Sequence, residues 1–334
     1  MNYIGSKLSL LPFLESTIQD VVGKDLHDKV FCDIFAGTGI VGRAYKSRVR
    51  KMIANDWEYF SYVLNRNYIG NHKELKDSDD YLAKLDALKG SKNGFIYNNY
   101  CLGGGSGRQY FSDENGIKID AIRSQIESWK DTGEISDDLY FFLLASLLES
   151  ADKRANTASV YGAFLKHLKK SAQKPLELQP ASFTVNNNAH DVYCADANKL
   201  IKRIEGDILY LDPPYNSRQY GANYHLLNTI AEYKPFIPKG KTGLRDYTRS
   251  SYCNKQKVLS SFNELIKSAN FKYVFLSYNN EGLMTLEDIK STMSRYGHYD
   301  CISLQYQRFR ADKQENRHHK ADKTVEYLHI LEKD

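Results

Sequence analysis

The tetrapeptide Asp212-Pro213-Pro214-Tyr215 groups the atoms that could bind and activate an amine on a planar base. Two consecutive prolines fix the backbone and remove its amide donors, so the carbonyls there act only as acceptors. The Asp212 carboxylate and the Pro213 carbonyl could accept both N–H hydrogens of an exocyclic amine, while Tyr215 stacks on the ring. The alternative is a turn that is only stiffened by proline. The combination favours a chemical role.

A second candidate site is the glycine turn Asp33-Ile34-Phe35-Ala36-Gly37-Thr38-Gly39. The turn lacks the third glycine of GxGxxG and does not match GxxxxGK[ST], which disfavours a phosphate cradle. Its two glycines let a ligand approach the backbone, and Asp56, about twenty residues later, could accept hydrogen bonds from both hydroxyls of a ribose. A nucleoside without phosphates would fit, and S-adenosylmethionine is such a ligand. The alternative is a tight turn with no ligand.

Short apolar runs lead into these loops and predict strands. A helix at 40–47 is expected after the glycine turn, and the charged stretch 308–320 is expected to be a loop. The alternation predicts an α/β fold with a mostly parallel sheet covered by helices. The strands are expected at 30–35, 52–54, 208–211 and 273–277, with a last strand at 324–331.

The interval from about residue 71 to 188 does not continue this alternation and is interpreted as an insertion. Helices are expected at 120–129 and 136–153. Ser136 suits a helix start because its hydroxyl can cap free amides, and Asp137 and Asp138 suit the positive end of the helix dipole.

Composition and charge exclude several classes of protein. The 334 residues are 42% hydrophobic and 26% charged, as in ordinary globular proteins. The most apolar stretch, 139–148, is too short for a membrane span, and the N-terminus lacks the pattern of a secretory signal, so a cytoplasmic protein is expected. Five widely separated cysteines without CxxC spacing argue against a disulfide framework and a zinc site, and no metal is predicted.

The net charge of +5 is too small to indicate nucleic acid by itself, but the charge is unevenly distributed. Between Lys234 and Lys257 there are seven basic residues and one acid, Asp246. Such a stretch suits the phosphates of a nucleic acid, although a basic run is most often a solvated face.

The order of these motifs, preceded by Asn2-Tyr3-Ile4-Gly5-Ser6-Lys7, resembles the Dam-like (D12 class, α-group) DNA adenine-N6 methyltransferases. The resemblance covers the first 70 residues and roughly 193–334. It implies a Rossmann-like S-adenosylmethionine-dependent methyltransferase fold with an antiparallel last strand. Tyr3 stands where the family often has Trp. By resemblance the cofactor residues are Tyr3, Lys7, Asp33, Phe35, Gly37, Gly39, Asp56 for the ribose and Asp196 for the adenine amine.

The resemblance implies methyl transfer to N6 of an adenine in a short duplex sequence. A base inside a duplex cannot reach such a site, so the adenine is expected to flip out. The sequence is similar to that of CATG-specific methylases, and a cognate restriction endonuclease acting on the same site is an expected partner. The alternatives are an RNA or protein-amide N-methyltransferase and a non-catalytic nucleic-acid-binding protein on the same fold.

The expected catalytic domain consists of residues 1–71 and 186–334, and the expected target-recognition domain of residues 72–185. Arg108 follows a glycine cluster in the insertion and is a candidate for reading bases. The candidates for contacts with a flipped base or with phosphate lie after the tetrapeptide; they are Arg218, Tyr220, Lys239, Lys241, Arg245 and Arg249.

Overall fold

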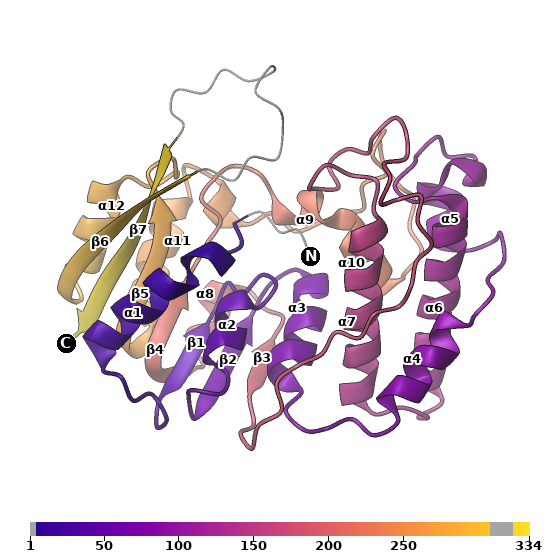
Figure 1. The fold of residues 1–334 in the computed structure, drawn as a ribbon. Helices are drawn as coiled ribbons and strands as arrows, with labels where there is room; N and C mark the ends of the chain where they lie inside the picture. Colours follow the sequence, from indigo (N-terminus) through magenta and orange to yellow (C-terminus); the bar gives the residue numbers. More distant parts are fainter. Residues whose placement is uncertain (1–4, 308–322) are drawn as a thin grey trace. The chain divides into compact units, whose positions relative to one another are not determined.

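Residues 5–307 and 323–334 are described in the computed structural model, and they divide into two units (Figure 1). Unit 1 contains Glu58–Asn187 and Tyr220–Thr248 together with Gly5. Unit 2 contains Ser6–Trp57, Asn188–Gln219 and Arg249–Asp334. The chain therefore passes between the units several times. The loop predicted at 308–320 lies outside the described residues.

Unit 2 is built on a sheet in which the seven described strands have the order β3-β2-β1-β4-β5-β7-β6. β1, β2, β3, β4 and β5 run parallel, whereas β7 pairs antiparallel with both β5 and β6. The prediction of a mostly parallel sheet with an antiparallel last strand is confirmed. The strands are β1 (Val30–Asp33), β2 (Lys51–Asn55), β3 (Asp191–Tyr193), β4 (Glu205–Leu211), β5 (Asn270–Asn279), β6 (Gly297–Gln307) and β7 (Lys323–Lys333).

The four parallel strands that the sequence predicted each contain a run of buried residues. All four residues of β1 are buried, as expected for a central parallel strand whose apolar run is nearly continuous. Every residue of β3 is only half-buried, and β6 begins with exposed and half-buried residues. Because neither strand has an apolar run, β3 and β6 were not predicted from the sequence.

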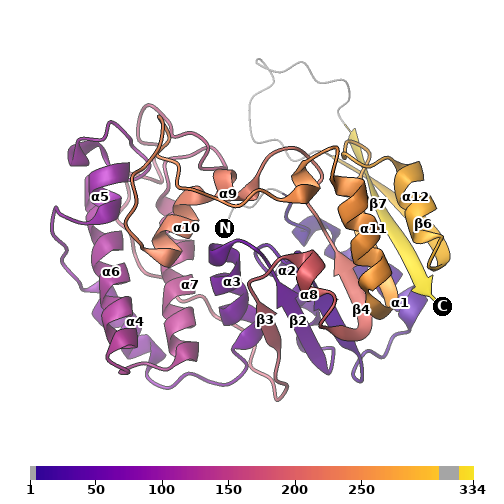
Figure 2. The same ribbon diagram turned by 180° about the vertical axis from the view of Figure 1, so that it is seen from behind.

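Helices cover both faces of the sheet of unit 2. α1 (Leu11–Val22) lies over one face in Figure 1, and α2 (Ile40–Tyr45) packs on the same face through the stacked rings of Tyr45 and Phe31. The opposite face, turned to the viewer in Figure 2, carries α8 (Ala197–Leu200), α11 (Val258–Ser268) and α12 (Leu286–Met293). Two 3₁₀ turns, η1 (Leu8–Leu10) and η4 (Ser251–Cys253), complete this unit.

Alternation along the strands decides which side chains meet which helices. Leu209 and Leu211 of β4 belong to the core that includes Phe262 of α11. Successive residues of a strand point to opposite faces, so Tyr210 and the following Asp212 are directed to the face of α1.

Unit 1 is mainly helical. Its core is centred on α7, in which every residue of 139–148 is buried, so the helix is buried on all sides there. The elements are α3 (Tyr59–Asn65), a π-helical turn η2 (Arg66–Gly70), α4 (Ser78–Asp86), α5 (Phe95–Tyr100), η3 (Leu102–Gly104), α6 (Asp113–Asp131), α7 (Asp137–Arg154), α9 (Tyr220–Asn223) and α10 (His225–Glu232).

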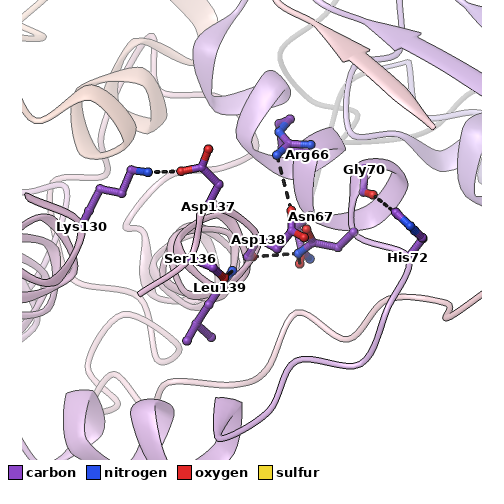
Figure 3. Close-up of polar contacts among 10 residues, drawn as sticks. Arg66, Asn67, Gly70, His72, Lys130, Ser136, Asp137, Asp138 and Leu139 are labelled. Atoms are coloured by element: carbon purple, nitrogen blue, oxygen red, sulfur yellow. Dashed lines mark hydrogen bonds and ion pairs between the residues drawn. The ribbon is translucent and has the colours of Figure 1, made fainter. Parts of the chain in front are cut away.

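The start of α7 is the one that the sequence predicted. The Ser136 hydroxyl accepts the backbone N–H of Leu139 at 3.2 Å. Arg66 forms an ion pair with Asp138 at 3.5 Å in the first turn of the helix (Figure 3). The other predicted helix is also present, but α6 starts earlier than expected, at Asp113, because the Ser112 hydroxyl caps it by accepting the N–H of Asn115.

Unit 1 includes more of the chain than the expected insertion at 72–185. Phe60 and Leu64 of α3 are fully buried in the same core as α7, and so are Leu227 and Ile230 of α10. The segments 58–71 and 220–248 therefore pack with the insertion. Across the part of the chain that the structure describes, no helix has the length and hydropathy to cross a membrane.

Candidate active site

The predicted site residues of unit 2 meet at one edge of the sheet. β1, β2, β3 and β4 are parallel, so their carboxyl ends share an edge. The strand order reverses between β1 and β4, and open α/β sheets bind ligands at such a point. The loops after these strands bring Asp33, Phe35, Gly37, Gly39, Asp56, Asp196, Asp212, Pro213, Pro214 and Tyr215 to this edge.

The glycine turn is shaped by backbone angles that other residues rarely adopt. Gly37 has φ of 52° and Gly39 has φ of 77°, both in the left-handed region. The N–H of Gly37 donates to the Asp56 carboxylate at 2.8 Å. Asp56 is therefore fixed against the glycine turn.

Asn55 connects three of the loops at this edge, a role that the sequence analysis missed. Its side-chain amide donates to the carbonyls of Ile34 at 3.0 Å and Ala195 at 3.1 Å, and its oxygen accepts the N–H of Ala195 at 3.0 Å. The neighbouring Asp196 caps α8 by accepting the N–H of Lys199 at 3.1 Å. The only sequence signal for Asn55 was its place directly before Asp56.

Asp33 is a buried carboxylate that is satisfied only in part: the Phe35 backbone N–H and the Lys7 charge stabilise it. It is 2% exposed, and its Oδ1 atom has no hydrogen-bond partner in the part of the chain that the structure describes. Burial, and then the nearby carboxylates of Asp212 and Asp56, raise the pKa of Asp33 well above the ordinary value. A buried oxygen of this kind is costly unless a donor satisfies it. A cationic or N–H-bearing ligand group, such as S-adenosylmethionine carries, fits this position.

The catalytic candidate Asp212 is paired with Lys7. The Lys7 Nζ atom lies 2.7 Å from the Asp212 Oδ1 atom and 3.5 Å from the Glu326 Oε1 atom of β7. Burial disfavours the Lys7 ammonium, but the two carboxylates outweigh this effect and raise the pKa of Lys7 above its ordinary value. Burial raises the pKa of Asp212, and the Lys7 charge opposes that rise. Glu326 was not predicted from the sequence, because no local motif surrounds it.

The tetrapeptide that contains Asp212 leaves β4 with Pro213 buried and Tyr215 half-buried. The Tyr215 carbonyl accepts the N–H of Leu283 at 3.0 Å, which fixes the end of the loop. Near the glycine turn, the Phe35 ring meets the edge of the buried Tyr252 ring at 5.0 Å between centroids. Aromatic rings therefore accompany the carboxylates at this edge of the sheet.

The structure places two of the predicted DNA-contact residues in unit 2. Arg218 and Arg249 are both exposed there. The backbone N–H of Arg218 donates to the Asn216 side chain at 2.9 Å, forming a turn directly after the tetrapeptide. Tyr3 lies outside the described residues.

The other predicted contacts lie in unit 1, and several belong to a hairpin. Lys239 and Leu244 exchange two backbone hydrogen bonds at 2.8 Å, and Gly240 and Gly243 turn the chain with φ of 67° and 71°. Lys241, between them, is exposed. We refer to residues 234–248 as the basic arm.

Arg108 fastens the basic arm to the insertion. Its guanidinium donates to the carbonyls of Gly240 at 3.0 Å, Lys241 at 3.3 Å and Asn99 at 3.1 Å. The Tyr100 hydroxyl donates to the Gly243 carbonyl at 2.7 Å. These bonds use three N–H groups of Arg108, and contact of this residue with bases stays a prediction.

The remaining predicted contacts are also engaged within unit 1. Arg245 forms an ion pair with Glu232 at 2.7 Å, and the exposed Lys239 forms one with Asp246 at 2.6 Å. The Tyr220 ring stacks with the Tyr224 ring at 6.0 Å between centroids.

Comparison with known proteins shows the family to which the chain belongs. Residues 3–292 match the family model of the D12 class N6 adenine-specific DNA methyltransferases. The chain belongs to this family. The family resemblance and the Rossmann-like methyltransferase fold predicted from the sequence are thereby confirmed, and the protein is an adenine-specific DNA methyltransferase.

Relatives in this family are similar over most or all of the chain. Type II methyltransferase M.NlaIII of Neisseria lactamica is 63% identical over 100% of this chain and 99% of its own length. Type II methyltransferase M.CviAII of Paramecium bursaria Chlorella virus 1 is 38% identical, with 93% of each chain covered. Type II methyltransferase M.FokI of Planomicrobium okeanokoites is 39% identical over 100% of this chain and 53% of its own length. The family implies a DNA substrate and S-adenosylmethionine as methyl donor.

Proposed function

We propose that this protein transfers a methyl group from S-adenosylmethionine to N6 of an adenine flipped out of a duplex CATG site. The product would protect the site from a cognate restriction endonuclease. The observation that carries the proposal is the placement of Asp212 and its tetrapeptide at the point where the strand order reverses, beside Asp33 and Asp56.

The residues after β1, β2 and β3 suit a nucleoside with a cationic tail. Asp56, fixed on Gly37, is proposed to bind the ribose hydroxyls, and Asp196 the adenine amine of the cofactor. The Asp33 oxygen that lacks a partner would accept from a donor of the ligand. S-adenosylmethionine supplies the methyl group when it is bound.

The tetrapeptide is proposed to activate the target amine. The N6 lone pair of adenine is delocalised into the ring, so the amine is a poor nucleophile until acceptors hold it in a more tetrahedral geometry. Asp212 and the Pro213 carbonyl would accept its two N–H hydrogens, and Tyr215 would stack on the base. Positive charge develops on N6 during the transfer, so both acceptors bind the transition state more strongly than the substrate.

The DNA is proposed to meet exposed cations in both units. Arg218 and Arg249 of unit 2 and the basic arm of unit 1 would contact phosphate, which positions the duplex without reading its sequence. The insertion, as part of unit 1, is proposed to read bases. The choice of CATG and of a type II modification system is supported by the 63% identity to M.NlaIII.

The test is transfer of labelled methyl from S-adenosylmethionine to unmethylated DNA, RNA and protein in parallel, followed by nucleoside analysis. We expect N6-methyladenine in DNA alone. Duplexes with one CATG site are then compared with duplexes in which the same four bases are scrambled, and only the former should accept label. Label in RNA or protein and none in DNA would overturn the proposed reaction, and equal label in both duplexes would overturn the proposed site.

A further inference from the structure

We propose that Glu326 is a positioning residue for methyl transfer, which acts on Asp212 through Lys7. This inference rests on the proposed function, because it assumes that Asp212 accepts from the target amine. Three buried or half-buried side chains carry it: Lys7 lies between two carboxylates, 2.7 Å from Asp212 and 3.5 Å from Glu326.

The sheet brings Glu326 to this position from a distant part of the sequence. In the register of the strands, Glu326 lies opposite Asn279 of β5, and β5 is the neighbour of β4. Leu331 of β7 packs in the core on the α11 face, so Glu326, five positions earlier, is directed to the opposite face. Asp212 is directed to that same face, where Lys7 precedes α1.

The second carboxylate changes the charge of the group around Asp212. An ion pair of Lys7 and Asp212 alone would be neutral, and the ammonium would weaken Asp212 as an acceptor. With Glu326 the group contains two carboxylates and one ammonium, so its net charge is −1. The Lys7 ammonium is then shared between Asp212 and Glu326. Asp212 then keeps more negative charge for the positive charge that develops on N6.

A structural role alone does not account for Glu326. It is only 4% exposed, and burying a second carboxylate beside an ammonium that already has a partner costs free energy. Burial, and to a smaller extent the Asp212 charge, raise the pKa of Glu326, while Lys7 opposes the rise. Buried ionisable side chains whose pKa values are shifted in this way are concentrated at functional sites.

Other titratable groups lie close enough to Lys7, Asp212 and Glu326 to interact with their charges. Asp33 interacts with both Asp212 and Lys7, and the Tyr215 hydroxyl interacts with Lys7. The buried Tyr210 hydroxyl donates to the Ser277 hydroxyl at 2.8 Å and lies within the field of Asp33, Asp212 and Glu326. Glu326 is the carboxylate of this group that comes from the antiparallel strand β7.

The experiment compares Glu326→Gln with wild type in single-turnover methyl transfer to duplex DNA. The variant keeps the shape of the side chain and removes its charge. We expect the rate of transfer to fall about tenfold, with the KM values for DNA and S-adenosylmethionine within about twofold of wild type. The acid limb of the pH–rate profile should move to lower pH, because Asp212 ionises more readily without a neighbouring negative charge. Glu326→Asp should restore part of the rate.

Two further measurements separate positioning from folding. Glu332→Gln removes an exposed carboxylate of the same strand, whose partner is Lys272 at 3.5 Å, and should keep the wild-type rate and profile. The pKa of the Lys7 ammonium, followed by NMR of labelled lysine, should fall in Glu326→Gln and stay unchanged in Glu332→Gln. This second readout does not depend on the reaction.

Two results would overturn the inference: an unchanged acid limb in Glu326→Gln, or an unchanged Lys7 pKa. If the wild type transfers no methyl to DNA, the proposed function fails, and the Lys7 pKa still decides whether Glu326 holds the ammonium. If the wild type is active and Glu326→Gln equals it, only the role of Glu326 fails.

Discussion

The charged residues of unit 2 and those of the basic arm in unit 1 are organised in opposite ways. At the carboxyl ends of the strands, carboxylates are buried and arranged around one cation, Lys7. In the basic arm, cations such as Lys241 are exposed, and the arm is held by a half-buried arginine, Arg108, that donates to backbone carbonyls.

This difference matches the two tasks proposed above, activation of a target amine by buried acceptors and contact of exposed cations with DNA phosphate. Buried acceptors act strongly on a small ligand because water does not screen them, but each must be placed precisely. Exposed cations act weakly and collectively on phosphate, and their individual positions matter less. Substitutions should therefore have large and specific effects in unit 2 and small, cumulative effects on the basic arm.

The largest expected effect is that of Asp212→Ala. Loss of the carboxylate should lower the rate of transfer by about 10³-fold or more, because this acceptor acts mainly on the transition state. The affinities for DNA and S-adenosylmethionine, measured by titration, should stay within a few-fold of wild type. Asp25→Ala, which removes an exposed carboxylate, serves as control. A variant that transfers methyl at a near wild-type rate would remove Asp212 from the reaction.

Smaller effects are expected on the affinity for DNA, and they should differ between Arg108→Ala and Lys241→Ala. Arg108→Ala breaks three bonds to the carbonyls of the arm and the insertion, and should weaken DNA binding roughly tenfold through loss of the arm's position. Lys241→Ala removes only the phosphate contact proposed above; it should weaken binding about threefold and lower the slope of log affinity against log salt by about 1.

The salt slope decides between the two explanations for Arg108. If Arg108 only positions the basic arm through backbone carbonyls, Arg108→Ala should keep a steeper dependence of log affinity on log salt than Lys241→Ala. The reason is that the lysines of the arm can still contact phosphate in part. If both variants lose the same slope and the same affinity, Arg108 is itself a phosphate contact. Arg50→Ala, an exposed arginine of unit 2 that bonds to the Asp28 carbonyl, is the control.

The smallest expected effect is on stability. Here the substitution should improve the measured property, whereas those above impair the rate or the affinity. The folded protein binds the Asp33 proton more tightly than the unfolded chain, because the folded-state pKa is raised. Stability therefore falls as the pH rises from about 3.8, the ordinary value, through the folded-state pKa. Asp33→Asn should raise the free energy of unfolding near neutral pH by about 1 kcal/mol, and the gain should disappear below the ordinary value.

Urea unfolding of Asp33→Asn at several pH values checks this prediction, with Asp191→Asn, at a half-exposed ion pair with Lys51, as the control. The same variant should bind S-adenosylmethionine more weakly. Lower stability than wild type at neutral pH would show that the Asp33 carboxylate is compensated in the folded protein.

The parts of the site that the sequence predicted are those encoded by short runs next to apolar strands. Gly37 and Gly39 need left-handed backbone angles, and Asp212 is followed by two prolines, so both motifs are visible without the fold. Parallel strands then bring their loops to one edge, which is why the predicted residues meet.

The parts that the sequence could not predict depend on contacts between distant segments. Glu326 reaches Lys7 only because β7 inserts beside β5, and nothing local marks it among the glutamates of the chain. Asn55 acts through backbone groups of two other loops. Arg108 was visible as a cation, but whether a cation meets carbonyls of its own chain or an external phosphate depends on folding.

The repeated passage of the chain between its two units constrains how such enzymes can exchange parts. The passages follow Gly5, Trp57, Asn187, Gln219 and Thr248. A chimera that replaced only residues 72–185 would remove α7 and leave α3 and α10 with their apolar faces against a foreign helix. A new specificity would have to be grafted as at least two segments, 58–187 and 220–248, so recombination at a single pair of crossover points should seldom give a folded enzyme.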